Sequence, residues 1–190
     1  MTTLFMTTVW LTTPVQASDP SKWIDKEETY STTGGKILKV MSSLPKGGGD
    51  YIELGGKKYS YVIFWTRIVN QSKSEITLDI KLPFDSLGIF SSKRSYMRLV
   101  LPPNKMDSDK VLQGDYGLTN LQSIINSDMA KSNAFYRTIK PKKDCYFYVI
   151  ELLHQVRGTA RSAISVAGEN LFYKAKVGQD STQILIGKVK

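Results

Sequence analysis

The stretch Tyr59–Ile80, YSYVIFWTRIVNQSKSEITLDI, decides how the rest of the chain can fold. Its first half is a run of aromatic and β-branched residues, which favour extended strands. Side chains alternate along a strand, so this run has two faces, and both of them are apolar. One face carries Tyr59, Tyr61, Ile63 and Trp65, and the other carries Val62, Phe64 and Ile68. We therefore predict a central strand that is buried on both sides.

The second half of the stretch predicts a turn followed by a partner strand. Asn70–Ser74 supplies side chains that hydrogen-bond their own backbone and so favour turns, and it also contains a glycosylation sequon. Apolar and polar residues then alternate from Glu75 to Ile80, which is typical of a strand with one solvated face. We interpret the whole stretch as a hairpin. A second doubly apolar run, Cys145–Leu153, has the same character, and we expect the two long strands to lie at the centre of the core.

One segment predicts a helix rather than a strand. Between Leu118 and Ala134, apolar residues recur at the spacing of a single helical stripe. The stripe consists of Leu118, Leu121, Ile124, Ile125 and Met129. Thr119 and Gln122 fit a capping box, in which each side chain bonds a free backbone donor of the first turn. We expect the stripe to pack on the sheet, because the opposite face has no band of lysines that would favour a membrane surface.

The remaining chain alternates short strand candidates with turn-forming residues. Leu44–Asp50, LPKGGGD, is interpreted as a flexible hairpin loop, and three strand candidates lie between Ala160 and Val189. Many short strands with a single helix predict a mainly β chain. We expect an antiparallel β-sandwich, immunoglobulin-like or jelly-roll-like in architecture, with one helical insertion near residues 118–134. A barrel is the alternative.

The N-terminal segment divides the chain into three parts. Residues 1–17 contain no charged side chain, and their last three, Val15-Gln16-Ala17, resemble the cleavage site of a secretory signal peptide. The positively charged start of such a peptide is missing, so a disordered N-terminus is the alternative. A polar segment follows over residues 18–35, and residues 36–190 are expected to form a single β-sandwich domain. We predict export to the periplasm or the extracellular space, and no transmembrane span, because residues 1–17 are too short and too polar for one.

Composition limits the chemistry open to this chain. Its 190 residues can bury a core without a disulfide or a metal. Cys145 is the only cysteine and His154 the only histidine, which excludes an internal disulfide and a structural zinc site built from these residue types. Twenty-six Lys and Arg against 17 Asp and Glu give a formal net charge of +9. Such a surface favours anionic partners, namely acidic glycans, lipid headgroups, cell-wall polymers or nucleic acid.

Basic residues gather at two places that we predict to bind a ligand. The predicted binding residues are Arg94, Tyr96 and Arg98 in the first cluster, and Lys140, Lys142 and Lys143 in the second. In the first cluster a ring stands between cations, so it can stack on a ligand that the cations neutralise. In the second cluster Pro141 stiffens the turn, which leads directly into the apolar run from Cys145. The alternative is that both clusters are solvated surface.

No motif specifies a catalytic reaction. His154 is the only side chain that could act as a general base near neutral pH without a large pKa shift, but no nucleophile motif accompanies it. Cys145 would be inert if buried, and its thiol would be more acidic beside Lys142 and Lys143 if exposed. We therefore predict no catalytic residue.

Acidic residues suggest two weaker alternatives. Glycoside hydrolysis needs two carboxylates converging in a cleft. The candidates are Asp79, Asp85, Glu151 and Glu169, of which Glu151, inside an apolar strand, is the most unusual. Asp107-Ser108-Asp109 alternates oxygen ligands as a calcium loop does, but it lacks the glycine and the final glutamate of an EF-hand. We predict no metal and no cofactor.

These observations together favour a non-enzymatic, exported binding or assembly module of the cell envelope. Its partner would be an anionic glycan, an envelope polymer or a protein that meets the basic face. Nucleic acid is a less favoured partner, because an exported protein meets glycans and surface polymers more readily. The alternative function is a carbohydrate-active hydrolase that uses Asp and Glu residues.

Overall fold

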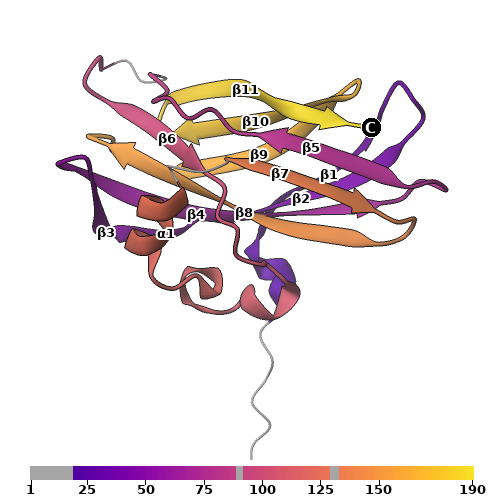
Figure 1. Cartoon of the computed structure of the whole chain (residues 1–190), viewed down its shortest axis with the longest axis horizontal. Helices are drawn as coiled ribbons and strands as arrows, with labels where there is room; N and C mark the ends of the chain where they lie inside the picture. Colours follow the sequence, from indigo (N-terminus) through magenta and orange to yellow (C-terminus); the bar gives the residue numbers. More distant parts are fainter. Residues whose placement is uncertain (1–18, 89–91, 129–132) are drawn as a thin grey trace, which may run out of the picture.

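Two antiparallel β-sheets packed face to face form the protein (Figure 1). The computed structural model describes residues 19–88, 92–128 and 133–190. Sheet A has the strand order β1-β2-β4-β8-β6, with β3 also paired to β4, and sheet B has the order β7-β5-β11-β10-β9. The predicted antiparallel β-sandwich is therefore confirmed. Residues 1–17, on which the prediction of a signal peptide rests, lie outside the described residues.

The strands of sheet A are β1 (Ile24–Ser31), β2 (Ile37–Ser43), β3 (Lys46–Leu54), β4 (Lys57–Asn70), β6 (Tyr96–Val100) and β8 (Asp144–His154). The strands of sheet B are β5 (Ile76–Lys81), β7 (Ala134–Ile139), β9 (Ala160–Ala167), β10 (Asn170–Val177) and β11 (Asp180–Val189). Strand β4 is long enough to pair with β3 along its first half and with β2 along its second half. Strand β8 pairs with the other side of β4, so the two predicted long strands lie side by side at the centre of sheet A.

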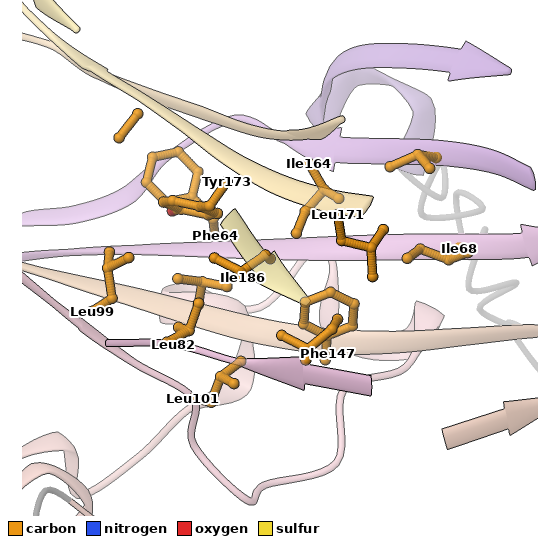
Figure 2. Packing of buried hydrophobic residues seen from close by; sticks show 14 of the residues in the cluster. Phe64, Ile68, Leu82, Leu99, Leu101, Phe147, Ile164, Leu171, Tyr173 and Ile186 are labelled. Carbon is orange, nitrogen blue, oxygen red and sulfur yellow. The ribbon is translucent and has the colours of Figure 1, made fainter. Parts of the chain in front are cut away.

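Both faces of β4 are buried because an apolar cluster lies on each side of sheet A. The inter-sheet core, part of which Figure 2 shows, contains Val62, Phe64 and Ile68. The outer cluster, on the face of sheet A that points away from sheet B, contains Tyr59, Tyr61, Ile63 and Trp65. The two faces predicted from the alternation of side chains are therefore confirmed.

The chain between β6 and β7 covers the outer cluster. It contains the short helices η2 (Ser108–Lys110), η3 (Gly114–Gly117) and α1 (Leu121–Asp128), and a further short helix, η1 (Pro20–Trp23), precedes β1. Five of its side chains are buried against sheet A: Met106, Val111, Tyr116, Leu118 and Ile125. Hydrogen bonds add to this packing, since Tyr148 Oη donates to the Tyr116 carbonyl at 2.7 Å and Tyr116 Oη donates to the Leu44 carbonyl at 2.6 Å.

Lys46, at the start of β3, ties this covering segment to the sheet. Its Nζ donates to the carbonyls of Val111 and Gln113 at 2.8 and 2.7 Å. The same ammonium lies 4.0 Å from the centre of the Trp23 ring and 4.2 Å from that of Tyr116, which are cation–π distances. Burial lowers the pKa of Lys46, but the nearby carboxylate of Asp115 opposes that effect. The lysine is therefore a structural clamp rather than a surface charge.

Replacing Lys46 by methionine is expected to lower the free energy of unfolding by about 2 kcal/mol, because two charge-assisted hydrogen bonds and two ring contacts are lost. Methionine keeps the length and the apolar stem of the side chain. Urea unfolding measures the loss, and Lys73→Met, at an exposed position in the turn after β4, is the control. Equal stability of both variants would contradict the clamp.

The predicted hairpin over Tyr59–Ile80 is wrong, because β4 belongs to sheet A and β5 to sheet B. The turn between them crosses from one sheet to the other. Ile76, Leu78 and Ile80 of β5 consequently face β4 across the inter-sheet core instead of lying beside it. Two apolar strands can bury their faces by stacking in two layers as well as by pairing edge to edge.

Asn70 holds this crossing in place from a fully buried position. Its Nδ2 donates to the carbonyls of Ser74 and Ile139, both at 2.9 Å, and its Oδ1 accepts from Ser72 N at 2.8 Å. Its backbone pairs with the turn from β7 to β8, where Lys142 N donates to Asn70 O at 2.9 Å. The sequon that begins at Asn70 therefore has its acceptor side chain inside the fold.

The predicted helix is shorter than expected. Helix α1 begins at Leu121, and Ala134 already belongs to β7, whereas residues 129–132, including Met129, lie outside the described residues. Gln122 does not complete the predicted capping box, because its side chain bonds both backbone groups of Glu53 on β3. The packing of the stripe on the sheet is confirmed by the outer cluster. Among the described residues, no helix is long and apolar enough to cross a bilayer.

One strand and the first part of another lie where no strand was predicted. Lys46–Asp50, expected as part of a flexible loop, is the first part of β3. Lys46 and Gly47 pair with β4, and the register then shifts between Gly47 and Tyr51 as in a β-bulge. The positive φ angles of Gly47 and Gly48, 93° and 100°, allow this bulge. Strand β1 lies in the segment described only as polar, where alternate side chains are half-buried. The predicted strands between Ala160 and Val189 are confirmed as β9, β10 and β11.

Candidate anion-binding site

Three aromatic rings, one from each of three neighbouring strands, lie in mutual contact at one end of sheet A. Tyr96 begins β6 and His154 ends β8, and the strand register places these two residues opposite each other. Tyr59 lies near the start of β4, one residue before Ser60, which pairs with Leu153. The His154 ring centre lies 4.7 Å from that of Tyr96 and 5.3 Å from that of Tyr59. We call Tyr59, His154 and Tyr96 the aromatic row.

Hydrogen bonds fix the rings of the row. The hydroxyl oxygens of Tyr59 and Tyr96 are 3.1 Å apart, and His154 Nδ1 lies 2.9 Å from the carbonyl oxygen of Lys58. A carbonyl can only accept, so Nδ1 carries the proton and Nε2 is the acceptor of the neutral ring. Tyr59 is buried, whereas Tyr96 and His154 are partly exposed. The rings of Tyr96 and His154 therefore form a fixed aromatic surface that is exposed to solvent and packs on the buried ring of Tyr59.

Two positive charges lie close to the row. Lys57, at the start of β4, has its Nζ 5.4 Å from the centre of the Tyr96 ring. On β6, Arg98 lies two residues beyond Tyr96 and so on the same face of the sheet, and its Nε donates to Ser86 Oγ at 2.9 Å. Within the described part of the chain, Lys57 takes part in no salt bridge. Its charge is therefore not neutralised by a neighbouring carboxylate.

Arg94 belongs to the same end of the sheet. It is exposed in the turn before β6. Ser95 Oγ donates to the carbonyl of Gln155 at 2.7 Å, which holds this turn against the residue that follows β8. The structure thus brings together the three predicted residues Arg94, Tyr96 and Arg98, and it adds Lys57, Tyr59 and His154 to them.

The environment acts on the two tyrosine hydroxyls in opposite directions. Burial raises the pKa of Tyr59 to about 12, and the hydrogen bond to Tyr96 adds to that rise. Burial would also raise the pKa of Tyr96, but hydrogen bonds from Tyr59 and Lys57 and the charges of Lys57 and Arg98 together lower it from its usual value. The partly exposed hydroxyl therefore lies in a positive field, which would also stabilise a bound anion.

The second predicted cluster lies on a different surface. The turn containing Lys140, Lys142 and Lys143 precedes Asp144, the first residue of β8, whereas the aromatic row lies at His154, its last. The length of β8 separates the two by about 33 Å. All three lysines are exposed, and backbone hydrogen bonds to Asn70 hold the turn on the sandwich. The structure does not join the two predicted clusters into one face.

The four carboxylates considered for hydrolysis are not brought together. Glu151 is fully buried in the inter-sheet space. Asp79 pairs with Lys190 at 2.7 Å, Glu169 accepts from Thr33 Oγ1 at 3.2 Å, and Asp85 lies in the segment that follows β5. Among the described residues, none of the five principal clefts is lined by two of these four.

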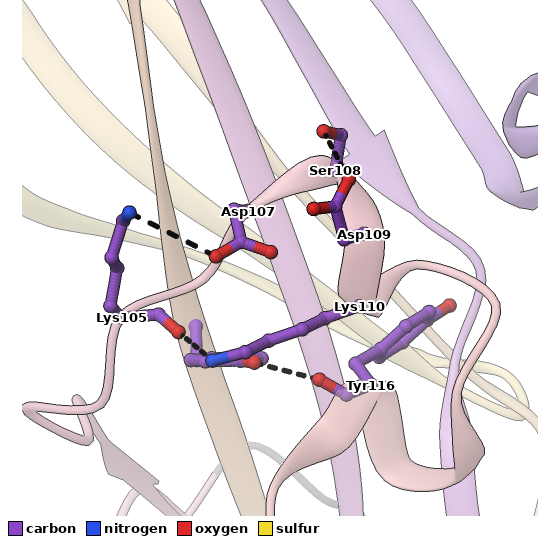
Figure 3. A network of polar contacts seen from close by, with 7 residues as sticks. Lys105, Asp107, Ser108, Asp109, Lys110 and Tyr116 are labelled. Atoms are coloured by element: carbon purple, nitrogen blue, oxygen red, sulfur yellow. Dashed lines mark hydrogen bonds and ion pairs between the residues drawn. The ribbon is translucent and has the colours of Figure 1, made fainter.

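Cys145 and the loop Asp107-Ser108-Asp109, the remaining candidates for chemistry, lie in surroundings that do not favour a reactive thiol or a metal site. Burial raises the pKa of Cys145 to about 12, which outweighs the opposing charge of Arg137, so its thiol stays protonated at neutral pH. Asp109 accepts from Ser108 Oγ, and Asp107 faces Lys105 Nζ at 4.0 Å (Figure 3). In the part of the chain that the structure describes, no group of three or more His, Cys, Asp or Glu side chains could hold a metal ion.

Sequence reasoning did not connect Tyr96 with the other two rings of the aromatic row. It assigned Tyr59 to the core, which its burial confirms, and it considered His154 only as a general base. The available indication for His154 was position, because an aromatic residue at the last place of a strand can be half-exposed. Which strand ends meet depends on the register of β4, β6 and β8, and a single sequence does not specify it.

Comparison with known proteins gives no relative for this chain. No family model matches it, and no significant match was found among curated proteins or among solved structures.

Proposed function

We propose that the protein is a non-enzymatic binding module of the cell envelope that holds an acidic glycan on the aromatic row. The observation that carries this proposal is a fixed group of three rings with the cations of Lys57 and Arg98 close to Tyr96. Sugar rings present apolar C–H faces that pack on aromatic rings, and their carboxylate or sulfate groups accept hydrogen bonds from Lys and Arg. Three paired strands hold the rings, so binding orders few side chains.

The shape of this surface favours a polymer over a small anion. Neither Tyr96 nor His154 lines any of the five principal clefts of the described residues. Lys57 comes from β4, Arg98 from β6 and Arg94 from the turn before β6, and the first two act on the partly exposed hydroxyl of Tyr96. An extended chain can meet all of them at once. An exported protein, as the leader-like residues 1–17 suggest, would meet acidic glycans at the cell surface.

Two triple variants with the same change of charge test where the polymer binds. The first replaces Lys57, Arg94 and Arg98 by glutamine, and the second replaces Lys140, Lys142 and Lys143 by glutamine. Heparin is the probe, with retention measured across a salt gradient and affinity by calorimetry at fixed salt. The first variant is expected to elute at lower salt and to bind about tenfold more weakly or worse, since charge-assisted contacts are lost. The second variant is expected to change the salt concentration at elution and the affinity for heparin only slightly.

A third variant, Tyr96→Ala, separates recognition from general charge attraction. It removes no charge, yet it is expected to weaken heparin binding about tenfold if the ring packs on the ligand. Unchanged binding by Tyr96→Ala would contradict a role for the row. A larger loss in the Lys140, Lys142 and Lys143 variant would place the anion site at the opposite end of β8 and so overturn this assignment. Preference for single-stranded DNA over heparin would overturn the assignment to glycans.

A further inference from the structure

A cleft runs beside the half of β8 that lacks a strand on one side. Strand β6 pairs with β8 only from Ile150 to His154. Over Asp144–Val149, β8 is therefore paired with β4 alone among the described strands. The segment Leu101–Lys105 and strand β7 form the walls of the cleft at this point, and its cavity volume is about 420 Å³. That volume lies within the range of small-molecule sites.

Apolar groups line most of this cleft. Six of its lining residues are Leu101, Pro102, Pro103, Phe135, Tyr146 and Phe147. Leu101, Pro102 and Phe147 are buried, and the ring centres of Phe135 and Phe147 are 4.9 Å apart. Figure 2 shows Leu101 and Phe147 at the edge of the inter-sheet core, so the cleft is continuous with packed apolar side chains. An apolar ligand group placed here would lose contact with water, which is favourable.

Two cations mark one side of the cleft. Arg137 and Lys105 line both this cleft and an adjoining one of about 680 Å³. The guanidinium of Arg137 lies 5.8 Å from the centre of the Phe135 ring, and none of the salt bridges of the described residues includes it. In the adjoining cleft Arg67 differs, because Asp144 lies 2.7 Å from its Nη2 and neutralises it.

Lys105 differs from Arg137 in having one long ion pair. Its Nζ lies 4.0 Å from a carboxylate oxygen of Asp107, and its side chain is 86% exposed. The backbone of Lys105 is fixed, because Lys110 Nζ donates to its carbonyl (Figure 3). The place where the two clefts meet therefore has a positive charge beside an apolar floor.

We propose that this cleft binds a small amphipathic anion, with its carboxylate at Arg137 and Lys105 and its apolar part against Pro102, Phe135 and Phe147. A guanidinium matches a carboxylate through two parallel hydrogen bonds. The Phe135 ring beside the guanidinium lets the charged head and the apolar tail bind as one unit. The site is separate from the aromatic row, and the ligand is small enough to be enclosed, unlike a glycan chain.

Octanoate is the probe, and octyltrimethylammonium, with the same chain and the opposite charge, is its counterpart. Calorimetry on the full chain is expected to show octanoate binding at least tenfold more tightly than the cation. Arg137→Gln is expected to weaken octanoate binding about tenfold, because one charge-assisted contact is lost. Arg94→Gln removes the same charge at the distant end of β8, and it is expected to leave octanoate binding unchanged.

Cys145 reports where the probe binds. It is the only cysteine of the chain and lines the adjoining cleft. Because burial raises the pKa of Cys145 to about 12, alkylation by iodoacetamide is followed over long incubations at alkaline pH. Octanoate is expected to slow this alkylation in the native protein, and octyltrimethylammonium is not. The variant Ala134→Phe adds a ring at the wall of the cleft. In this variant octanoate is expected to bind more weakly and no longer to slow the alkylation of Cys145.

Each contrary result would overturn the inference. Equal affinity for the cation, or an equal loss in Arg94→Gln, would show an unspecific apolar or charge effect. Unchanged alkylation of Cys145 during octanoate binding would place the probe elsewhere. Absence of octanoate binding by a protein that still binds heparin would remove this site and leave the proposed function standing.

Discussion

Replacing Glu151 by glutamine is expected to remove a loss of stability of about 2.5 kcal/mol that the native protein suffers between pH 5 and pH 8. Glu151 is fully buried between the sheets. Its Oε1 accepts from Ser162 Oγ of β9 and, at 3.0 Å, from Tyr173 Oη of β10, whereas Oε2 has no hydrogen-bond partner among the described residues. Its neighbours across sheet A are Val62 of β4 and Leu99 of β6.

The direction of this effect follows from the pKa of Glu151. Burial raises it from 4.5 to about 7, and the hydrogen bonds from Ser162 and Tyr173 only partly oppose that rise. The folded state therefore keeps a proton that the unfolded chain releases above pH 4.5. Stability is greatest below that pH, falls as the pH rises toward 7, and stays low above it, with a total loss of about 3 kcal/mol. No lysine or arginine contributes to the shift, and Tyr173, whose own pKa burial raises well above its usual value, stays neutral.

Urea unfolding at several pH values measures this effect as the difference between native protein and variant. Glutamine keeps the shape and the acceptor oxygen of the side chain, but its amide group does not titrate. Glu75→Gln, at an exposed position in the turn before β5, is the control and should follow the native pH profile. If Glu151→Gln lost stability with rising pH as the native protein does, Glu151 would not be the group that titrates.

Replacing Gly187 by alanine is expected to cost about 3 kcal/mol or more of unfolding free energy. Gly187 lies opposite Ile80 where β11 meets β5. A Cβ atom at this position would lie 2.0 Å from the carbonyl oxygen of Asp79 and 2.9 Å from the Cα atom of Ile80. Both atoms belong to the backbone of β5, so no side-chain rotation can relieve the overlap.

The place of Gly187 in sheet B makes this overlap costly. The pairing of β5 with β11 joins β5 and β7 to the rest of the sheet, and it extends over only three register pairs. Moving β5 away would break this pairing and open the inter-sheet core beside it. Gly88→Ala is the matched control, because nothing lies within 4 Å of its added Cβ atom. Thermal and urea unfolding should show a change below about 0.5 kcal/mol for the control. Similar stability of the two variants would contradict the close approach at Gly187.

Part of each candidate site could be predicted from the sequence, and part could not. Arg94, Tyr96 and Arg98 are near one another in the chain, so their proximity around the start of β6 could be predicted. Lys57 and His154 join them only through the pairing of β4, β8 and β6. The cleft at Arg137 had no sequence indication, because its walls come from β7, β8 and the segment after β6. Its existence depends on β6 being too short to accompany β8 to its end.

Properties that depend only on neighbouring residues could be predicted from the sequence alone. Alternation along Tyr59–Trp65 specified which side chains share a face, because successive side chains of any strand point to opposite sides. Apolar residues on both faces showed that something must cover each of them. The spacing of Leu121, Ile124 and Ile125 likewise specified a helix and its buried side. These statements hold whatever the rest of the chain does.

Which surfaces meet could not be predicted from local sequence and became clear from the packed fold. The same alternating residues after Asn70 could have paired with β4 as a hairpin, and they instead face it from sheet B, where the buried side chain of Asn70 fixes the crossing. Glu151 looked like a candidate acid in the sequence, and its surroundings came from β9 and β10, which follow it in the chain. A local pattern indicates that a face must be buried. Which segment buries it depends on the free energy of the whole packed fold, to which distant segments contribute as much as neighbours.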